Sequence, residues 1–290
     1  MSLDAVKLNI SATINDYKRD RKIPFPSDIT QFRNIPYGTN GKWNLLDVYF
    51  PNGTSTPLPT IVNIHGGGFV YGTKEIYRRY CMYLAKQGFT VVNFNYRLAP
   101  KWKFPTPLLD TNSVMEWIVK YAEEFFMDTD RIFLVGDSAG AQLASQYAAI
   151  VTNLEYANLL GITVPAVHIR GLCLNCGLYD MPDSCGAAPS GIMKDYLGAD
   201  ADRADPRLDV LGAITSAYPP AYITTAYNDF LFEAAEPMYN HLISKGLDAQ
   251  WKCYGTKEQE EVGHVFHINI IHPEAIKCNT DTCEFFRKYL

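Results

Sequence analysis

The sequence predicts an α/β fold, with a mostly parallel central sheet flanked by helices on both faces. Two observations predict it. Short apolar runs typical of buried strands alternate along the chain with longer segments of helical periodicity. Two of these runs also end directly at glycine-rich turns, and the second turn leads straight into an alanine-rich helical segment. No internal repeat or low-complexity tract interrupts this alternation.

The expected elements follow in chain order. Asp4 to Arg21 is predicted to be a short amphipathic helix that ends before Pro24, because Val6, Ile10, Ile14 and Tyr17 recur near helical spacing. Strands are expected around residues 45–50, 60–65, 90–95, 131–135, 169–176, 220–227 and 249–254. Helices are expected near residues 74–87, 106–124, 141–151 and 230–242.

The most informative motif is Gly136-Asp137-Ser138-Ala139-Gly140, between the strand at 131–135 and the helix at 141–151. In a strand, turn and helix context, G-x-S-x-G forms a nucleophile elbow. The flanking glycines tolerate a strained backbone, which holds the serine hydroxyl above the sheet edge. Ser138 is therefore the candidate nucleophile. By composition alone, a chain of this length contains roughly 0.1 such matches by chance, so a second motif is needed.

That second motif is His65-Gly66-Gly67-Gly68-Phe69, which follows the apolar run at 60–64. A random His-Gly-Gly-Gly run is expected only about 0.002 times in such a chain, which makes this pair of motifs specific. Successive glycines allow backbone N–H groups to point at a ligand. The motif indicates an oxyanion hole with donors from Gly67 and Gly68, and a third donor from Ala139. The alternative is a flexible glycine loop.

Together, the two motifs resemble the hormone-sensitive-lipase-like branch of the α/β-hydrolase superfamily, often grouped with bacterial acetyl esterases. The resemblance extends over about residues 40 to 290. It includes the stretches Tyr96-Arg97-Leu98-Ala99-Pro100, Phe104-Pro105 with Asp110, Asp130-Arg131-Ile132, Tyr218-Pro219-Pro220-Ala221 and Asp229 to Glu233. It implies an α/β-hydrolase fold, with one domain over residues 1–290 and a small helical cap.

The superfamily order is serine, then an acid, then histidine. The strand at 220–227 ends at Asn228-Asp229, which puts a carboxylate at the carboxyl end of a strand, where catalytic groups gather in open α/β sheets. Asp229 matches the acid of the family. Its alternative role is to cap the helix that follows, because capping and triad roles compete for the same oxygens. Glu233, one turn later, is the fallback acid.

The candidate base follows the polar loop at 255–263. In the related family a histidine followed by x-Phe carries the proton, which selects His264. His267, about one helical turn later, is the alternative base, although an apolar face can also carry a structural histidine. Of the remaining histidines, His65 is expected to hold the glycine loop through hydrogen bonds. Surface or packing roles are expected for His168, His241 and His272.

The expected strand and helix rhythm is interrupted between Tyr179 and Ala217. A loop of this length in a compact domain usually has functional structure of its own. The resemblance implies that residues of about 179–217 pack with about 1–25 as a cap over the site. We expect an apolar underside and an acyl pocket from Ile192, Met193, Tyr196 and Leu197, together with Phe69, Val70 and Tyr71. For each of these residues, simple core packing is the alternative.

The resemblance implies a serine carboxylesterase. Ser138 attacks the ester carbonyl, His264 takes its proton, Asp229 orients the imidazole, and the N–H groups of Gly67, Gly68 and Ala139 stabilise the oxyanion. The expected substrate is a small-molecule ester with a short to medium acyl chain. No metal or organic cofactor is required.

Two other functions are compatible with the same motifs. An arylformamidase or amide hydrolase would use the same triad. A non-catalytic ligand-binding relative would keep the pocket and lose the triad histidine, but His264 is present at the motif position. A purely structural protein would leave both glycine motifs unexplained.

The net charge of −5 gives no reason to expect nucleic acid as a partner. No apolar run reaches the length of about 18 residues that a membrane span needs. The resemblance also makes a homodimer through the last sheet edge possible.

A cytoplasmic location is expected. Met1 to Lys22 lacks the unbroken apolar core, about 7–15 residues long, of a signal peptide. The seven cysteines are an odd number, scattered through the expected strands and helices, which favours reduced thiols. Cys173 and Cys176 form a C-x-x-C pattern. Their odd spacing along a strand directs the side chains to opposite faces, so buried thiols are favoured over a redox or metal site.

Overall fold

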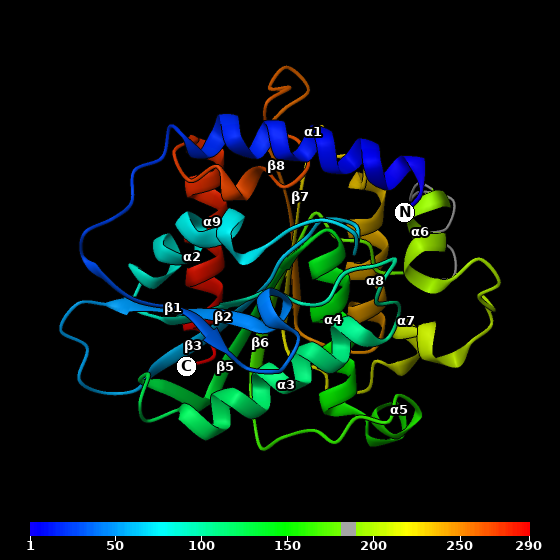
Figure 1. The fold of residues 1–290 in the computed structure, drawn as a ribbon, viewed down its shortest axis with the longest axis horizontal. Coiled ribbons are helices and arrows are strands. Elements are labelled where there is room, and N and C mark those ends of the chain that lie inside the picture. Colours follow the sequence, from blue (N-terminus) through cyan, green and yellow to red (C-terminus); the bar gives the residue numbers. More distant parts are fainter. Residues whose placement is uncertain (181–189) are drawn as a thin grey trace.

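A computed structural model describes residues 1–180 and 190–290 of the chain (Figure 1). In this part of the chain, eight strands form one sheet in the order β1-β2-β4-β3-β5-β6-β7-β8. The strands are β1 (Ile29–Pro36), β2 (Leu45–Pro51), β3 (Leu58–Ile64), β4 (Thr90–Phe94), β5 (Met127–Asp137), β6 (Ile169–Asn175), β7 (Ala221–Ala226) and β8 (Ala249–Tyr254). The pairs that involve β2 are antiparallel and all the others are parallel. The predicted α/β class with a mostly parallel sheet is confirmed.

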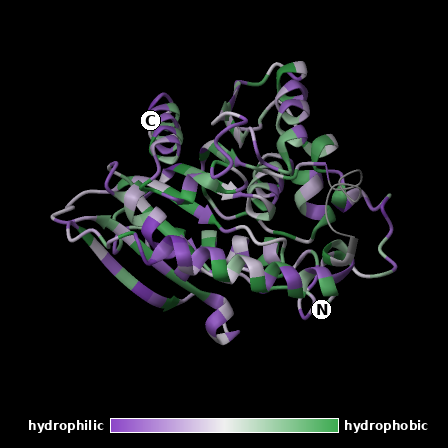
Figure 2. Cartoon of the chain, turned by 90° about the horizontal axis from the view of Figure 1, so that it is seen from above, coloured by the Kyte–Doolittle hydropathy of each residue, from purple (hydrophilic) through white to green (hydrophobic). Residues whose placement is uncertain are grey.

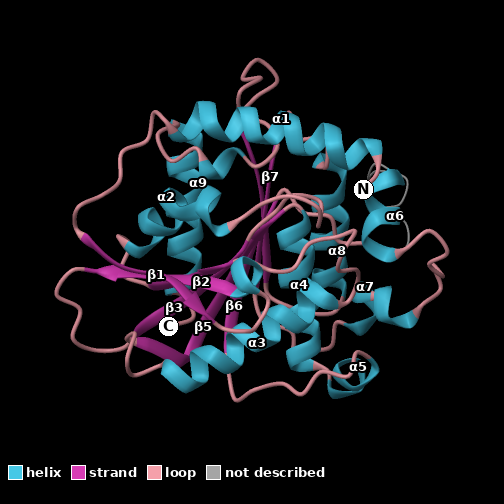
Figure 3. Ribbon diagram, viewed as in Figure 1, coloured by secondary structure: helices cyan, strands magenta, loops and turns pink. Residues whose placement is uncertain are grey.

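Helices cover both faces of this sheet (Figure 3). The α-helices are α1 (Leu3–Asp20), α2 (Lys74–Ala85), α3 (Thr106–Tyr121), α4 (Ala139–Thr152), α5 (Leu154–Leu159), α6 (Ser190–Leu197), α7 (Val210–Ala213), α8 (Ala235–Ser244) and α9 (Pro273–Arg287). Short 3₁₀ helices are η1 (Gly41–Asn44), η3 (Pro206–Leu208), η4 (Phe232–Ala234) and η5 (Phe266–Ile268). Helices α2 and α9 pack on one face of the sheet, and α3, α4 and α8 pack on the other.

The two layers of helices explain why the strands are apolar at successive positions. Val62 and Leu134 belong to the core beneath α3, α4 and α8, whereas Ile61 and Phe133 belong to the core beneath α2 and α9. Successive side chains of a strand point to opposite faces, so a strand buried on both sides needs apolar residues throughout. This is the origin of the continuous apolar runs that predict β3, β4 and β5.

The register of the parallel strands places several loops at one edge of the sheet. Ile64 pairs with Gly136, Asp137 pairs with Asn175, and Asn175 pairs with Thr224. The residues that follow these four strands therefore leave the sheet side by side at its carboxyl edge. The two glycine motifs, the end of β6 and the loop after β7 are thus brought together, although they are far apart in the sequence.

Helix α1 differs from the expectation in its orientation. The helix forms where it is predicted, but Ile10, Ile14 and Tyr17 are exposed, and the side that faces the protein contains Ala5, Leu8 and Ala12. Helical periodicity identifies one face as apolar, but it does not determine which face packs on the protein.

Helix α6 lies in the segment that was expected to form part of a cap, and it contacts α1 (Figure 1). The backbone N–H of Ser2 donates to Asp195 at 2.6 Å, and the N–H of Gly191 donates to Asp4 at 3.2 Å. Residues 181–189 of the expected cap lie outside the described residues. Within the described residues, no helix combines the length and the apolar character needed to cross a bilayer.

Candidate active site

Ser138 sits in a sharp turn between β5 and α4. Its backbone has φ 52° and ψ −119°, a left-handed conformation that costs free energy for any residue other than glycine. The turn requires glycine two residues later, because a Cβ atom on Gly140 would lie 2.0 Å from the carbonyl oxygen of Ile64. The Ser138 N–H donates to the carbonyl of Asn175 on the neighbouring strand at 2.9 Å. This is the geometry that the elbow motif predicts.

The glycine loop after β3 is folded against the elbow. Gly67 has φ 113°, and a Cβ atom there would lie 2.2 Å from the carbonyl oxygen of Tyr71. Gly67, Gly68 and Ala139 line the same cavity as Ser138. Among the described residues, none of the N–H groups of these three donates to a protein acceptor. Unpaired backbone donors on a cavity wall are rare in proteins and are suited to bind an oxygen with negative charge.

His65 holds the start of this loop, as expected. Its Nδ1 lies 2.8 Å from the carbonyl oxygen of Gly66, which can only accept, so this nitrogen carries the proton. The ring stacks on Tyr96 with ring centroids 4.1 Å apart, and the Tyr96 hydroxyl donates to the His65 carbonyl. Burial lowers the pKa of His65 to about 4, so the ring is neutral. Its role is structural support of the loop.

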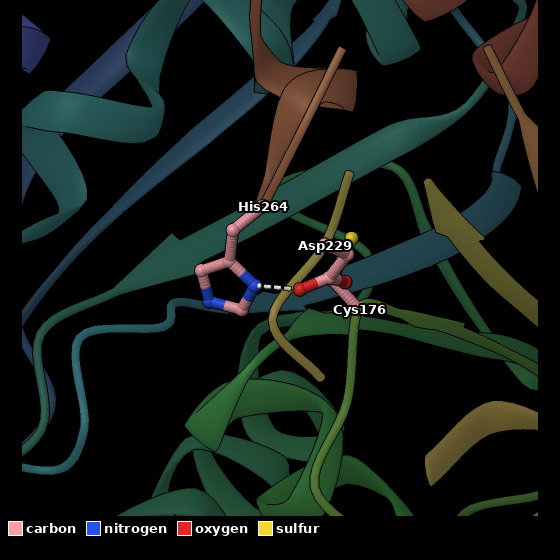
Figure 4. A group of neighbouring side chains, drawn as sticks. All are labelled: Cys176, Asp229 and His264. Carbon is pink, nitrogen blue, oxygen red and sulfur yellow. Dashed lines mark hydrogen bonds and ion pairs between the residues drawn. The ribbon is translucent and has the colours of Figure 1, made fainter. Parts of the chain in front are cut away.

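His264 and Asp229 are hydrogen-bonded across the loops that follow β7 and β8 (Figure 4). Nδ1 of His264 lies 2.7 Å from Oδ1 of Asp229, and His264 also lines the cavity that Ser138 lines. Burial alone would raise the pKa of Asp229, but the hydrogen bond and charge of His264 and the N–H of Leu231 outweigh it and lower the pKa. Asp229 is therefore ionised at neutral pH.

Asp229 holds the turn that follows it as well as the imidazole. Its Oδ1 accepts from His264 and also from the N–H of Leu231 at 2.9 Å, while Oδ2 accepts from Thr225 at 3.1 Å. A carboxylate oxygen has two lone pairs, so one oxygen can hold the following turn and the imidazole at the same time. Asp229 does not cap the helix that follows, which was its alternative role, because the N-cap residues of η4 and α8 are Leu231 and Ala234.

Cys176 was missed as part of this group. Its Sγ, a carboxylate oxygen of Asp229 and a ring nitrogen of His264 lie within 4.8 Å of one another (Figure 4). The thiol is buried, and burial raises its pKa well above the ordinary value, so it is protonated. The register of the sheet would have predicted its position, because Cys176 is the residue at which β6 leaves the carboxyl edge. Among the described residues, this is the one group with three closely spaced metal-ligand side chains.

The alternative site residues lie elsewhere. His267 is fully buried beside the Tyr80 ring, where burial lowers its pKa to about 3, and it does not line the cavity. Glu233 is exposed on η4 and makes no hydrogen bond or ion pair with His264 in the described residues. His168 is exposed beside Asp130, and Nε2 of His241 donates to the carbonyl oxygen of Leu211.

Asp137, the residue before the candidate nucleophile, is fully buried. Its Oδ2 accepts from the Tyr77 hydroxyl at 2.8 Å, and the Tyr77 oxygen in turn accepts from the Gly66 N–H at 3.1 Å. Burial raises the pKa of Asp137 to about 7. This chain of hydrogen bonds ties the elbow to the glycine loop, so both keep a fixed relative position.

The cavity that joins these groups has a volume of about 810 Å³. Phe69, Tyr71, Ile192 and Met193 line it, as expected for an acyl pocket. Val70, Tyr196 and Leu197 do not line it. Tyr196 instead stacks on Phe69 with ring centroids 3.8 Å apart. The inward side of α1 forms another part of the wall, including Leu8, Ser11, Asn15 and Arg19.

Cys173 and Cys176 of the C-x-x-C pattern are free thiols with different neighbours. Cys173 lies in β6 with its Sγ 3.2 Å from the Thr282 hydroxyl, and Cys176 lies beside Asp229. All six cysteines in the described residues are free, and five of them are buried. Cys185 lies outside the described residues.

Comparison with known proteins identifies an α/β-hydrolase fold. The model of a family described as having an alpha/beta hydrolase fold matches residues 61–268. The chain is 29% identical over 208 residues to ethyl acetate hydrolase of Pseudomonas putida, a match that covers 66% of this chain and 62% of the relative. It is 27% identical over 222 residues to acetyl esterase of Salmonella typhi, covering 71% of this chain and 66% of the relative. Each match thus spans slightly less than two thirds of the relative's length.

Solved structures show the same fold. Esterase B from Lactobacillus rhamnosis has a TM-score of 0.88 at 24% identity, with 97% of this chain and 92% of that chain covered. A bacterial heroin esterase has a TM-score of 0.78 at 23% identity, with 100% and 94% covered.

Proposed function

This chain belongs to the α/β-hydrolase fold family, and from that premise we propose that it is a serine carboxylesterase acting on small esters with short to medium acyl chains. The observation that carries the proposal is the Asp229–His264 hydrogen bond on a cavity shared with Ser138 and three unpaired backbone N–H groups. These are the parts that acyl transfer requires: a nucleophile, a base with its orienting acid, and donors for the oxyanion.

In the proposed first step, the Ser138 hydroxyl oxygen attacks the ester carbonyl carbon while Nε2 of His264 takes its proton. The carbonyl oxygen becomes negative and is stabilised by the N–H groups of Gly67, Gly68 and Ala139. When this intermediate collapses, the bond to the alcohol oxygen breaks and His264 returns the proton to that oxygen. The alcohol leaves and the acyl group stays on Ser138 as an ester.

In the second step, water attacks the acyl carbon while His264 takes a proton from it. Collapse returns the Ser138 hydroxyl and releases the carboxylic acid. Asp229 stabilises the imidazolium in both steps and fixes the tautomer in which Nε2 is free to accept. The proposed steps use no metal or organic cofactor.

We further propose that α1 and the segment at about 179–217 form a cap that sets acyl-chain preference. Ile192 and Met193, on α6, line the cavity, so they are better probes than Tyr196 and Leu197. Ile192→Ala and Met193→Ala should shift the preference among acetyl, butyryl and decanoyl esters toward longer chains. An unchanged profile in both variants would remove these residues from the acyl site.

The test of the proposal is labelling with a fluorophosphonate, which reacts quickly only with an activated serine. Wild-type protein and Ser244→Ala should be labelled and should hydrolyse p-nitrophenyl acetate, because Ser244 is exposed at the end of α8 and does not line the cavity. Ser138→Ala should do neither while remaining folded. A wild-type protein that binds acyl esters without labelling would be a non-catalytic binding protein. Faster turnover of a formanilide than of phenyl acetate would indicate an amide hydrolase.

Two further parts of the proposal concern assembly and location. A homodimer would form through β8, whose outer edge has no neighbouring strand in the described residues, and sedimentation velocity measures it. A cytoplasmic location fits the free thiols of the described cysteines, and fractionation of cells tests it.

A further inference from the structure

Helix α1 turns small apolar residues and several polar residues toward the protein, whereas most of its large apolar residues face solvent. Toward the protein, Asp16 accepts from the Tyr71 hydroxyl at 2.8 Å, Asn9 bonds the Val70 carbonyl, and Ser11 and Asn15 line the cavity. A surface helix of a globular protein normally has the opposite arrangement, with its apolar stripe on the core. Packing within this chain therefore does not explain why these apolar side chains of α1 face solvent.

The outward side of α1 is a continuous apolar stripe. Leu3 is 68% exposed, Ile10 59%, Ile14 48% and Tyr17 69%. Their spacings of seven, four and three residues place them on one side of a helix, within an arc of about 60°. We call these four residues the outer stripe. Single exposed apolar residues are common, but a row of them along one helix marks an interaction surface.

The charges of α1 and the residues directly after it are also separated. The carboxylates of Asp4 and Asp16 turn inward: Asp4 accepts from the Gly191 N–H, and Asp16 pairs with Arg19 at 2.7 Å. Asp20 pairs with Arg19 as well. The exposed charged residues beside the outer stripe are all basic: Lys7, Lys18, Arg21 and Lys22. In the described residues, none of these four makes an ion pair with a carboxylate, although the chain as a whole has a net charge of −5.

From this arrangement we propose that the outer face of α1 docks the protein on an anionic lipid bilayer. An apolar stripe bordered by cations is the pattern of helices that lie in the interface of a membrane, where apolar side chains enter the acyl boundary and lysine and arginine contact anionic headgroups. A second copy of the chain is a poorer occupant. In a symmetric contact between two outer faces, cations would meet cations, and no carboxylate on that face would balance them.

Docking by this face has a consequence for the cavity. The inward side of α1 forms part of the cavity wall, and the helix lies across the molecule along one side (Figure 1; Figure 2 views the chain from that side). The cavity is thus separated from the docked surface by about one helix diameter, roughly 10 Å. If the proposed esterase activity holds, esters dissolved in the bilayer are the substrate class that this position favours.

The test measures binding of the protein to lipid vesicles and not ester hydrolysis, so its result is independent of the proposed function. Wild-type protein and Ser138→Ala should co-sediment equally with vesicles of phosphatidylglycerol and phosphatidylcholine in equal parts, and much less with pure phosphatidylcholine. Lys18→Gln with Arg21→Gln should weaken partitioning to the anionic vesicles by roughly 30-fold. Ile10→Asn with Ile14→Asn should weaken it by about tenfold or more.

Matched controls exist on the opposite side of the molecule, where α3 and α5 lie (Figure 1). Leu154 is 75% exposed and Lys120 is also exposed, so Leu154→Asn and Lys120→Gln change similar side chains away from α1 and should leave partitioning unchanged. All these residues are exposed, so thermal unfolding should stay close to wild type.

Two results would overturn the proposal. The first is wild-type protein that does not sediment with the anionic vesicles, or that loses binding equally in the control variants. The second is a wild-type dimer, seen by sedimentation velocity, that Ile10→Asn with Ile14→Asn dissociates while no variant binds vesicles. That second result would assign the outer stripe to a second copy.

Discussion

The Nδ1 atom of His264 lies 2.7 Å from Oδ1 of Asp229, although 35 residues separate the two in the chain. The carboxylate accepts from His264 and the Leu231 N–H on the oxygen that faces the imidazole, and from the Thr225 hydroxyl on the other oxygen. A carboxylate fixed in this way has little freedom to turn, so it fixes the orientation of the ring. Loss of its charge should therefore affect the base more than the fold.

Asp229→Asn tests this directly. The amide keeps the size of the side chain but favours the wrong imidazole tautomer, so kcat for p-nitrophenyl acetate should fall by a factor on the order of 10⁴. Glu233→Gln is the matched control and should retain wild-type kcat, because Glu233 is exposed and does not bond His264. A large loss in the Glu233 variant with little loss in the Asp229 variant would identify Glu233 as the acid.

Gly67→Ala should disable the oxyanion donors. A Cβ atom there meets the Tyr71 carbonyl at 2.2 Å, so the loop has to move and its N–H groups with it. We expect kcat to fall by about 10² to 10³. Gly88→Ala separates this effect from backbone strain, since Gly88 also has a positive φ, of 94°, but has open space around it. It should lower stability by about 1 kcal/mol and leave kcat unchanged.

Cys176 is expected to act on Asp229 as a positioning residue. Cys176→Ala removes the thiol, whose contact helps to lower the pKa of Asp229, and should reduce kcat by severalfold with KM unchanged. Cys176→Ser restores a small donor and should recover most of the loss. Equal losses in both variants, accompanied by a lower unfolding temperature, would indicate packing alone.

Asp137 should make stability depend on pH. Its pKa is raised by burial to about 7 in the folded protein, above the ordinary value of 3.8. The folded state therefore holds the proton more tightly than the unfolded state does. The stabilisation is fully present below about pH 4, declines as pH rises, and is lost above about pH 7.

The matching variant is Asp137→Asn, which cannot ionise but can still accept from Tyr77. Relative to this variant, the wild type should lose a free energy of unfolding on the order of a few kcal/mol between pH 4 and pH 8. Urea unfolding at a series of pH values measures the difference. Parallel curves for the two proteins would show that Asp137 is ionised in the folded state throughout this range.

Local motifs could be predicted from the sequence, because a tight turn depends on residues that are adjacent in the chain. The elbow at Ser138 and the loop at Gly67 and Gly68 have the conformations that their glycines suggest. The Asp229–His264 pair is different. The residues alone left His267 and Glu233 open, and only the family resemblance selected one pair, because the pairing depends on how two distant loops meet.

Other features depended on tertiary contacts that a single sequence does not contain. Strand β1 is an edge strand with several exposed positions, so it has no apolar run to predict it. Helix α9 was not predicted either. Cys176 was assigned to a buried strand, and its contact with Asp229 appears only once the register of β6 and β7 is known. The apolar periodicity of α1 could be predicted, but the side of the helix that packs on the protein could not.

The reacting groups proposed here all sit on loops at the carboxyl edge of the sheet, and neither α1 nor α6 contributes any of them. The residues proposed to react with the substrate and the helices that cover the cavity therefore belong to different segments of the chain. A chimaera in which the covering segments of a relative replace those of this chain should accept different substrates while the residues that break the ester bond stay in place. The chain is therefore a practical scaffold for engineering selectivity.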